Sequence, residues 1–443
     1  MHESGSPKAH DAAGTKGEAP GIHSENFRFP AGFLWGAATS SHQVEGDCRQ
    51  NDWWAWEQAG KVAQPSGAAC EHYQRFRDDF DLARQLNHNA HRLSLEWSRI
   101  EPEEGRFSPE GLAHYREVLE ALRERGIEPV VTLHHYTLPV WLAERGGWEL
   151  PGVEQLFARY VGRVLDEFKH LVRWWITLNE PVVHVFKSYV IGQWPPGKQD
   201  YGAAFGAVRH MLRAHVLAYH EIHARRPDAM VSVAKHALAL TSCNPRRLLD
   251  RVSVKVRGYV FNDLFLDALH TGALRVPGLF WERLPQARTL DFIGLNYYTR
   301  DFVHNTGIHL PGLLGEVCTL EHHRNVGKRN DLGWEVYPEG LGHFLRSYSR
   351  FKLPILITEN GVPAAQDEDR WSFINLHLWQ VARAINDGVP VAGYLYWSLL
   401  DNFEWADGYQ ARFGLVGIDF ATQERTVRGS ARRLARVIDE NSL

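Results

Sequence analysis

Eight short apolar runs recur along the chain, each rich in aliphatic, β-branched or aromatic residues. Within them, apolar residues follow one another without strict alternation with polar ones. Continuous runs of this kind are typical of parallel strands that are buried on both faces of a sheet. They predict strands at residues 33–40, 90–97, 128–135, 173–180, 230–237, 290–297, 354–360 and 391–398.

The segments between these runs have helical periodicity. Residues 108–126 begin with Ser-Pro, carry apolar residues three and four positions apart and end at a glycine, and residues 152–170 are similar. Alternating strands and helices predict a single α/β domain at residues 26–443, a (β/α)₈ TIM barrel whose long βα loops form a pocket. The alternative is an open doubly wound sheet, which usually has an early glycine-rich phosphate turn that this sequence lacks.

The N-terminal segment differs from the rest of the chain. Residues 1–25 are rich in Gly, Ala, His, Ser and Pro and lack the apolar stretch of a secretory signal. We predict a disordered tail there. No apolar run is long enough to span a bilayer, so we expect no membrane association.

Composition narrows the classes of function. The formal net charge is −4, which argues against nucleic acid as a partner. Four cysteines lie far apart without zinc-site spacing, so we expect free thiols in a reducing cytoplasm. The chain has 16 Trp, 15 Tyr and 21 Phe. These rings either stack on sugars or fill the core, and composition does not separate the two.

Two acids follow predicted strands at matching positions. Glu180 ends the run "ITLNE", and Glu359 lies in "ILITENG". Reacting groups of a TIM barrel lie at the C-terminal ends of its strands, so these carboxylates could face one another across the barrel. Such a pair can cleave a glycosidic bond, because one acid protonates the leaving oxygen while the other attacks or activates water. The alternative is that each acid is an N-cap or a solvated loop residue.

Histidines at strand ends raise the question of a metal. His134, His135 and His236 lie at such ends, but no carboxylate-rich set accompanies them. Metal-dependent barrels need several His and Asp ligands from separate strands. We therefore expect neither a metal nor a cofactor at the site.

Six motifs in order resemble glycoside hydrolase family 1, the retaining β-glycosidases, from about Phe27 to the C-terminus. They are "FLWGAATSSHQVEG" (33–46), "TLNEP" (177–181), "GLNYYT" (294–299), "WEVYPEGL" (334–341), "ITENG" (357–361) and "WSLLDNFEWADGYQARFGLVGID" (397–419). The resemblance implies an exo-acting retaining β-glycosidase, foremost a β-glucosidase, with β-galactosides or β-fucosides as further substrates. Its partners would be small β-glycosides and oligosaccharides, and the chain would be a monomer or a homo-oligomer. The alternatives are a transglycosylase using the same site and a carbohydrate-binding pseudoenzyme.

The resemblance also implies residue roles. Glu180 matches the general acid/base, Glu359 the nucleophile, and Asn179 the residue that holds the sugar 2-hydroxyl. Tyr298 and Arg92 match the pair beside the nucleophile. The implied substrate-binding residues are Gln43, His135, Tyr136, Asn296, Trp334, Trp397, Glu404, Trp405 and Phe413.

These roles carry an electrostatic expectation. Arg92 and Tyr298 near Glu359 would keep it ionised, and that charge together with burial would raise the pKa of Glu180. Without the resemblance, Arg92 could instead pair with Glu96. Likewise, the tryptophans assigned to sugar binding could simply fill the barrel.

Three departures from the family pattern concern specificity. Tyr136 stands where the family usually has Trp, so its hydroxyl could replace an indole N–H at the sugar. Glu404 and Phe413 replace parts of the Ser, Lys and Tyr set of the phospho-sugar branch, which predicts a neutral sugar. The Trp-rich stretch "NDWWAWE" (51–57) either lines the entrance or packs the first loop.

Overall fold

The computed structural model describes residues 27–276, 280–318 and 327–443. The tail predicted at residues 1–25 lies outside these ranges.

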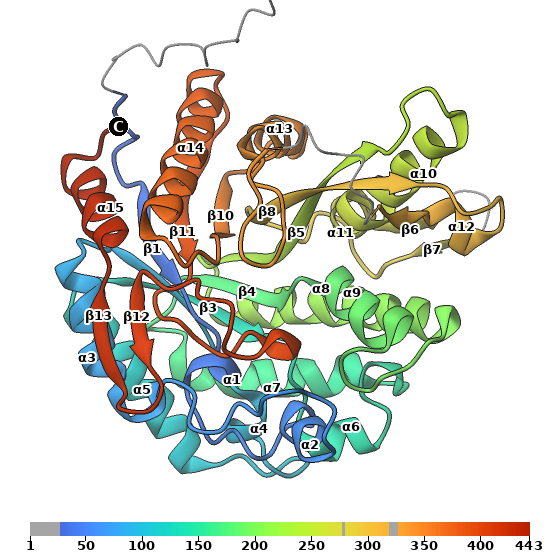
Figure 1. Cartoon of the computed structure of the whole chain (residues 1–443). Helices are drawn as coiled ribbons and strands as arrows, with labels where there is room; N and C mark the ends of the chain where they lie inside the picture. Colours follow the sequence, from blue (N-terminus) through green and yellow to red (C-terminus); the bar gives the residue numbers. More distant parts are fainter. Residues whose placement is uncertain (1–26, 277–279, 319–326) are drawn as a thin grey trace, which may run out of the picture.

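Eight parallel strands close into a barrel (Figure 1). Closure is shown by β10, which pairs with both β8 and β11, and by β1, which pairs with both β11 and β2. The eight strands are β1 (Leu34–Ala38), β2 (Ala90–Ser94), β3 (Glu128–His134), β4 (Trp174–Asn179), β5 (Met230–Ser242), β8 (Ile293–His304), β10 (Ile355–Asn360) and β11 (Val391–Trp397). Each coincides with one of the predicted apolar runs, so the (β/α)₈ barrel is confirmed.

Two barrel strands are longer than predicted. β5 and β8 continue past the barrel rim side by side, from the pair Ala239 and Arg300 to the pair Ser242 and Val303. The short strand β9 (Glu316–Val317) pairs antiparallel with the far end of β8. We call this three-stranded projection the β5–β8–β9 extension. Polar residues in both segments made them resemble loops in the sequence.

The remaining strands form two antiparallel hairpins outside the barrel. They are β6 (Ala273–Val276) with β7 (Phe280–Arg283), and β12 (Val416–Asp419) with β13 (Glu424–Val427).

Helices surround the barrel and fill its βα loops (Figure 1). The helix predicted at residues 108–126 is α5, whose cap Ser108 accepts a hydrogen bond from the Gly111 N–H. The α-helices are α1 (Ser41–Val44), α2 (Asp52–Gln58), α3 (His72–Gln85), α4 (Trp97–Ile100), α5 (Pro109–Glu124), α6 (Val140–Glu144), α7 (Val153–Phe168), α8 (Pro181–Val185), α9 (Tyr201–Arg225), α10 (Leu248–Gly258), α11 (Leu264–Thr271), α12 (Leu310–Leu314), α13 (Pro338–Tyr348), α14 (Asp367–Asn386) and α15 (Gly429–Glu440). No helix within the described ranges is long and apolar enough to cross a membrane.

The core has two parts. A large apolar layer lies between the barrel and its helices. A second, small cluster has fully buried side chains from or beside seven of the barrel strands: Ala90, Val130, Ile176, Ala234, Phe292, Leu356 and Leu395. All but Leu395 lie in or before the first half of their strand, away from the C-terminal ends where TIM-barrel active sites form.

Candidate active site

A cavity of about 430 Å³ opens at the C-terminal ends of the barrel strands. Its volume is within the range of small-molecule sites. All the predicted site residues line it except Arg92 and Asn296, which lie beneath its floor. The lining set is Gln43, His135, Tyr136, Asn179, Glu180, Tyr298, Trp334, Glu359, Trp397, Glu404, Trp405 and Phe413.

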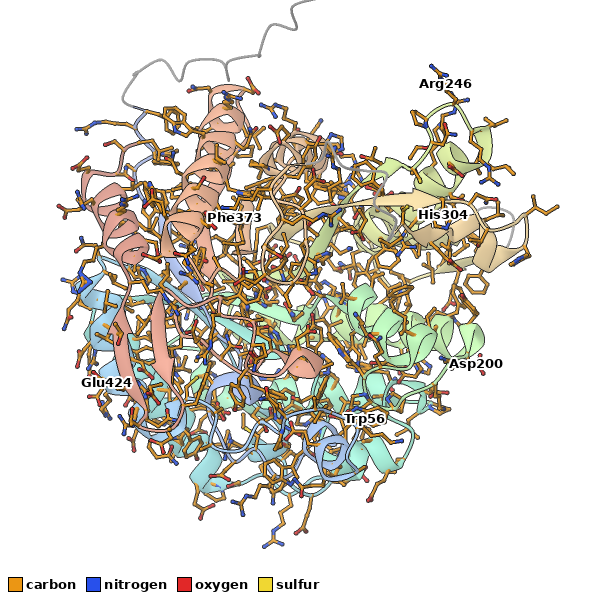
Figure 2. All side chains as sticks on the ribbon, viewed as in Figure 1. Trp56, Asp200, Arg246, His304, Phe373 and Glu424 are labelled. Atoms are coloured by element: carbon orange, nitrogen blue, oxygen red, sulfur yellow. The ribbon has the colours of Figure 1, made fainter. Side chains whose placement is uncertain are left out.

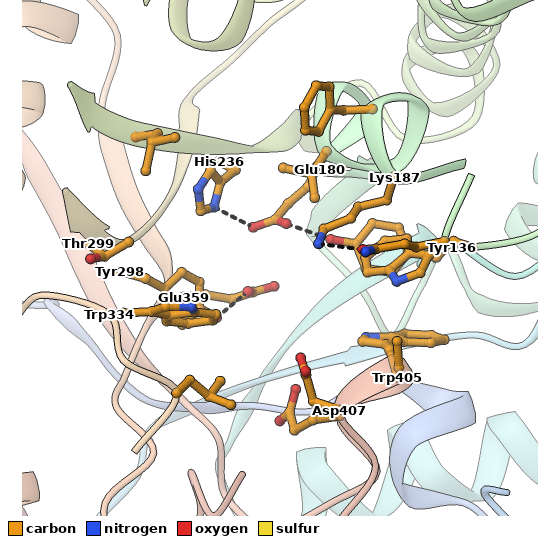
Figure 3. A pocket seen from close by; sticks show the side chains of 18 of the residues that line it. Tyr136, Glu180, Lys187, His236, Tyr298, Thr299, Trp334, Glu359, Trp405 and Asp407 are labelled. Carbon is orange, nitrogen blue, oxygen red and sulfur yellow. Dashed lines mark hydrogen bonds and ion pairs between the residues drawn. The ribbon is translucent and has the colours of Figure 1, made fainter. Parts of the chain in front are cut away.

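Glu359 lies near the end of β10 and is held from two sides. The Arg92 guanidinium donates from Nη1 to Oε1 of Glu359, and the Tyr298 hydroxyl donates to Oε2 at 2.6 Å (Figure 3). Arg92 is fully buried and also donates from Nη2 to Oδ1 of Asn179 at 2.6 Å. Its partner is therefore the predicted nucleophile, and the alternative pairing with Glu96 is wrong.

Glu96 has a different task. Its carboxylate accepts hydrogen bonds from the hydroxyls of Ser41, Ser98 and Thr137.

Glu180 follows β4 directly and precedes Pro181, the first residue of α8. Its φ is 41°, and its side chain makes no capping hydrogen bond, so the N-cap interpretation is wrong. Instead, the carboxylate accepts a hydrogen bond from the Tyr136 hydroxyl at 2.5 Å and from Nδ2 of Asn296 at 2.8 Å. His236 lies on its other side, with Nδ1 3.2 Å away (Figure 3).

Two strands, β5 and β8, separate β4 from β10 around the barrel. β8 supplies the connection between the two acids, because Asn296 donates to Glu180 while its Oδ1 accepts from the Thr358 hydroxyl at 2.6 Å. Thr358 is the residue before Glu359. Asn360, on the other side, donates to the Tyr297 carbonyl and accepts from the Tyr394 hydroxyl, which ties β10 to both neighbouring strands.

The electrostatics differ from the expectation. Burial, together with the Glu180 charge, outweighs Arg92 and raises the pKa of Glu359 to about 7. Burial also acts on Glu180, but there the His236 cation and hydrogen bonds from Tyr136 and Asn296 outweigh it and lower the pKa to about 2. The two buried carboxylates interact directly, so they hold and lose protons as a pair, with one proton shared between them near neutral pH. The prediction of a raised pKa at Glu180 is wrong, because it omitted His236.

The far wall of the pocket carries the residues assigned to the terminal sugar. Oε1 of Glu404 accepts from the Trp397 indole at 3.0 Å, and Oε2 accepts from Gln43 at 3.3 Å. The His135 ring lies nearly parallel to the rings of Trp397 and Trp405, with centroids 6.0 and 6.1 Å away. Burial raises the pKa of Glu404 to about 8, so it would repel a sugar phosphate only above that pH.

The three tryptophans of the stretch 51–57, Trp53, Trp54 and Trp56, are not part of the pocket wall. Trp53 is buried and packs on Trp405 with ring centroids 4.6 Å apart, in a cluster with Tyr136 and Trp194. None of the three tryptophans in residues 51–57 lines the cavity, whereas Trp194 does. The stretch therefore packs the first loop. Tyr136 lines the cavity and directs its hydroxyl to Glu180.

Two of the strand-end histidines point to different partners. His134 is buried and stacks on His184 with centroids 5.5 Å apart, whereas His236 contacts Glu180.

Several lining residues escaped sequence analysis. His236 could have been found from its place at the end of the fifth barrel strand, where the sequence suggested only a metal ligand. The others come from α8 and the segment after it, from β5 and the β5–β8–β9 extension, from α10 and the residues after it, and from the segment before Trp334; no motif covers these positions. They are Val183, Phe186, Lys187, Ile191, Gln193, Trp194, Leu238, Arg257, Phe261, Asp301, Val317 and Leu332.

Comparisons of the sequence with known proteins all identify the same family. The profile of glycosyl hydrolase family 1 matches residues 25–276 and 281–443. A 1,4-β-D-glucan glucohydrolase from Thermotoga neapolitana is 33% identical over 94% of this chain and 99% of its own length. β-Glucosidase A from Thermotoga maritima is also 33% identical, with the same coverage.

Solved structures agree. A β-glycosidase from Pyrococcus horikoshii is 38% identical and superposes with a TM-score of 0.89 over 95% of this chain and 96% of that one. A Thermotoga maritima β-glucosidase in complex with glucoimidazole is 32% identical, with a TM-score of 0.86 over 94% and 99%.

Proposed function

Because the chain belongs to glycosyl hydrolase family 1, we propose that it removes terminal β-D-glucosyl residues from small β-glucosides and gluco-oligosaccharides, and also accepts β-galactosides or β-fucosides. The protein is a retaining β-glycosidase. The observation that carries the proposal is the meeting of Glu180 and Glu359 in one cavity, each held by its own set of donors. Both carboxylates are present, which argues against a pseudoenzyme.

In the first step, Glu359 attacks the anomeric carbon while Glu180 gives its proton to the glycosidic oxygen. The carbon–oxygen bond to the leaving group breaks, and an ester bond to Glu359 forms. Arg92 and Tyr298 fix the orientation of the attacking carboxylate. Asn179, held by Arg92, would bind the sugar 2-hydroxyl.

In the second step, Glu180 is a carboxylate and accepts a proton from water. The water oxygen bonds to the anomeric carbon, and Glu359 leaves with the electrons of the ester bond. Tyr136, Asn296 and His236 surround Glu180 and are placed to stabilise the carboxylate that the first step creates.

The stereochemistry of the product tests this scheme. Two displacements at one carbon restore its configuration, so proton NMR during hydrolysis of p-nitrophenyl β-D-glucoside should show β-glucose before mutarotation. An α-anomer as the first product would rule out a glycosyl-enzyme.

The paired acids predict the pH dependence of kcat/KM. Activity needs one proton on the pair, and this proton is lost as the pH rises through about 7, the raised value at Glu359. We therefore expect kcat/KM to decline above about pH 7. In a His236→Asn variant the imidazole that lowers the pKa of Glu180 is replaced by an amide, so the decline should move to higher pH, by about one unit.

The matched control for this variant is His220→Asn, an exposed histidine on α9. Its pH profile should equal that of the unchanged protein. If the pH dependence of kcat/KM is unchanged in His236→Asn as well, His236 does not set the pKa of Glu180.

We also propose a cytoplasmic location, because Cys48 and Cys70 are buried free thiols. This chain supplies both carboxylates and the residues assigned to the sugar, and we propose that a monomer suffices for activity.

A further inference from the structure

The β5–β8–β9 extension ends in three residues with metal-binding side chains. Cys243 follows β5 directly, His304 is the last residue of β8, and Cys318 follows β9 directly. The Cys243 N–H donates to the Val303 carbonyl at 2.8 Å, and the Cys318 N–H donates to the Phe302 carbonyl at 2.7 Å. Successive carbonyls point to opposite sides of a strand, so the two cysteines flank β8.

The three side chains share one face of the extension and converge. One possible ligand atom from each of Cys243, His304 and Cys318 lies within 4.8 Å of the other two. His304 is directly opposite Glu316 in the β8–β9 pair, and its Nε2 is 4.0 Å from the Glu316 carboxylate. Figure 2 shows His304 in the extension, which projects from the barrel.

A disulfide does not fit this arrangement. Because β8 lies between the two cysteines, their Cα atoms are separated by about two strand spacings, roughly 9.5 Å. A disulfide needs Cα atoms closer than about 7 Å. The two sulfurs approach one another across one face of β8, so they can instead bind one ion. His304 on β8 supplies a third ligand.

We propose that Cys243, His304 and Cys318 bind one divalent cation of the zinc class, with water or Glu316 as the fourth ligand. Zinc takes sulfur at about 2.3 Å and imidazole nitrogen at about 2.0 Å in a tetrahedron, which places ligand atoms about 3.5–3.8 Å apart. The ligand atoms need to approach one another by at most about 1.3 Å to reach these separations. Two thiolates neutralise the ion, and soft ligands select zinc over magnesium or calcium.

Proton release sets the pH dependence of this site. Cys243 and Cys318 must lose their thiol protons to bind the ion, so Zn²⁺ affinity should increase as the pH rises. Asp250 and Arg247 also act on Cys243, but Asp250 is held by the N–H groups of Asn244 and Asn305. Glu316 is the charged group that faces His304, and its carboxylate is 71% exposed.

Such an ion would join three strands beside the catalytic pocket. Val317, which lies between Glu316 and Cys318 on β9, is one of the residues that line the catalytic cavity. A bound ion would therefore fix part of the wall where the leaving group of the substrate passes. Stability and leaving-group preference are the properties it would change, rather than the chemistry at the two acids.

The test uses the full chain, reduced and freed of metal with a chelator. We expect Zn²⁺ titration against a chromogenic chelator to show one tight site, and Co²⁺ to give thiolate-to-cobalt charge-transfer absorption. Cys243→Ser and Cys318→Ser should each weaken binding by at least about 100-fold. Cys48→Ser, which removes a buried thiol outside the cluster, should bind as the unchanged chain does.

Equal Zn²⁺ affinity in the unchanged chain and the Cys243→Ser variant would overturn the proposal. A Co²⁺ complex without thiolate-to-cobalt charge-transfer absorption would also overturn it. So would a Cys243–Cys318 disulfide, seen as a mass two hydrogens lower in the protein before reduction. If a serine variant does not fold, His304→Asn tests the same site at a half-exposed residue. That variant should keep hydrolysis of p-nitrophenyl glucoside while Zn²⁺ affinity falls.

Discussion

Replacing Glu359 with glycine should reduce hydrolysis of β-glucosides by on the order of 10⁴-fold or more, because no other group can form the glycosyl-enzyme. Removing the carboxylate leaves a space between Arg92 and Tyr298, on the side from which Glu359 would attack the anomeric carbon of the substrate. Added azide can enter that space and attack from the same face. With an activated glucosyl donor, turnover should return and the product should be the α-glucosyl azide, measured by NMR.

Glu368→Gln provides the control for this experiment. It removes one carboxylate from the exposed first turn of α14, where the side chain is 72% exposed, and should leave the rate unchanged. Ordinary activity in Glu359→Gly, or a β-azide as product, would show that the nucleophile is another residue.

Replacing Glu180 with alanine should give a loss that depends on the leaving group. Substrates with a poor leaving group, such as cellobiose, need the proton and should lose about 10²–10⁴-fold in kcat/KM. A 2,4-dinitrophenyl glucoside needs no proton to depart, so its kcat/KM should decline much less. The glycosyl-enzyme should then accumulate, and azide should release it as the β-glucosyl azide.

A uniform loss for both substrates would contradict an acid role for Glu180. Tyr136→Phe is the matched comparison, because it removes one hydrogen bond to the carboxylate and leaves the acid in place. It should show a smaller loss and no azide product.

The barrel could be predicted because its signal is local. Strands buried on both faces are rich in apolar residues, and each barrel strand overlaps a predicted run of this kind, although β2 also buries His91 and Arg92. The far halves of β5 and β8 were missed, since beyond the barrel only one face is covered and polar residues such as Arg300 and Asp301 enter the strands. A loop and a half-covered strand then look alike in sequence.

The site could be predicted for those residues that lie in the sequence motifs. Glu180 and Glu359 were found together with their immediate neighbours, and the structure brings them into one cavity. The protonation state was not predictable, because it depends on His236, whose approach to Glu180 results from the pairing of β4 with β5. The Cys243, His304 and Cys318 cluster was invisible for a similar reason, since its members lie on three separate strands.

The hydrogen bonds of the Asn296 amide bear on how the substrate range of the enzyme can be changed. Its hydrogen bonds to Glu180 and to Thr358 run within the barrel and position the two acids relative to one another, and the βα loop after β3 adds the Tyr136 hydroxyl to Glu180. The wall beyond them comes from α8, the segment that follows it, α10 and the β5–β8–β9 extension. Loops could therefore be exchanged with those of a relative to change which aglycone is accepted, while the reaction centre is transferred unaltered.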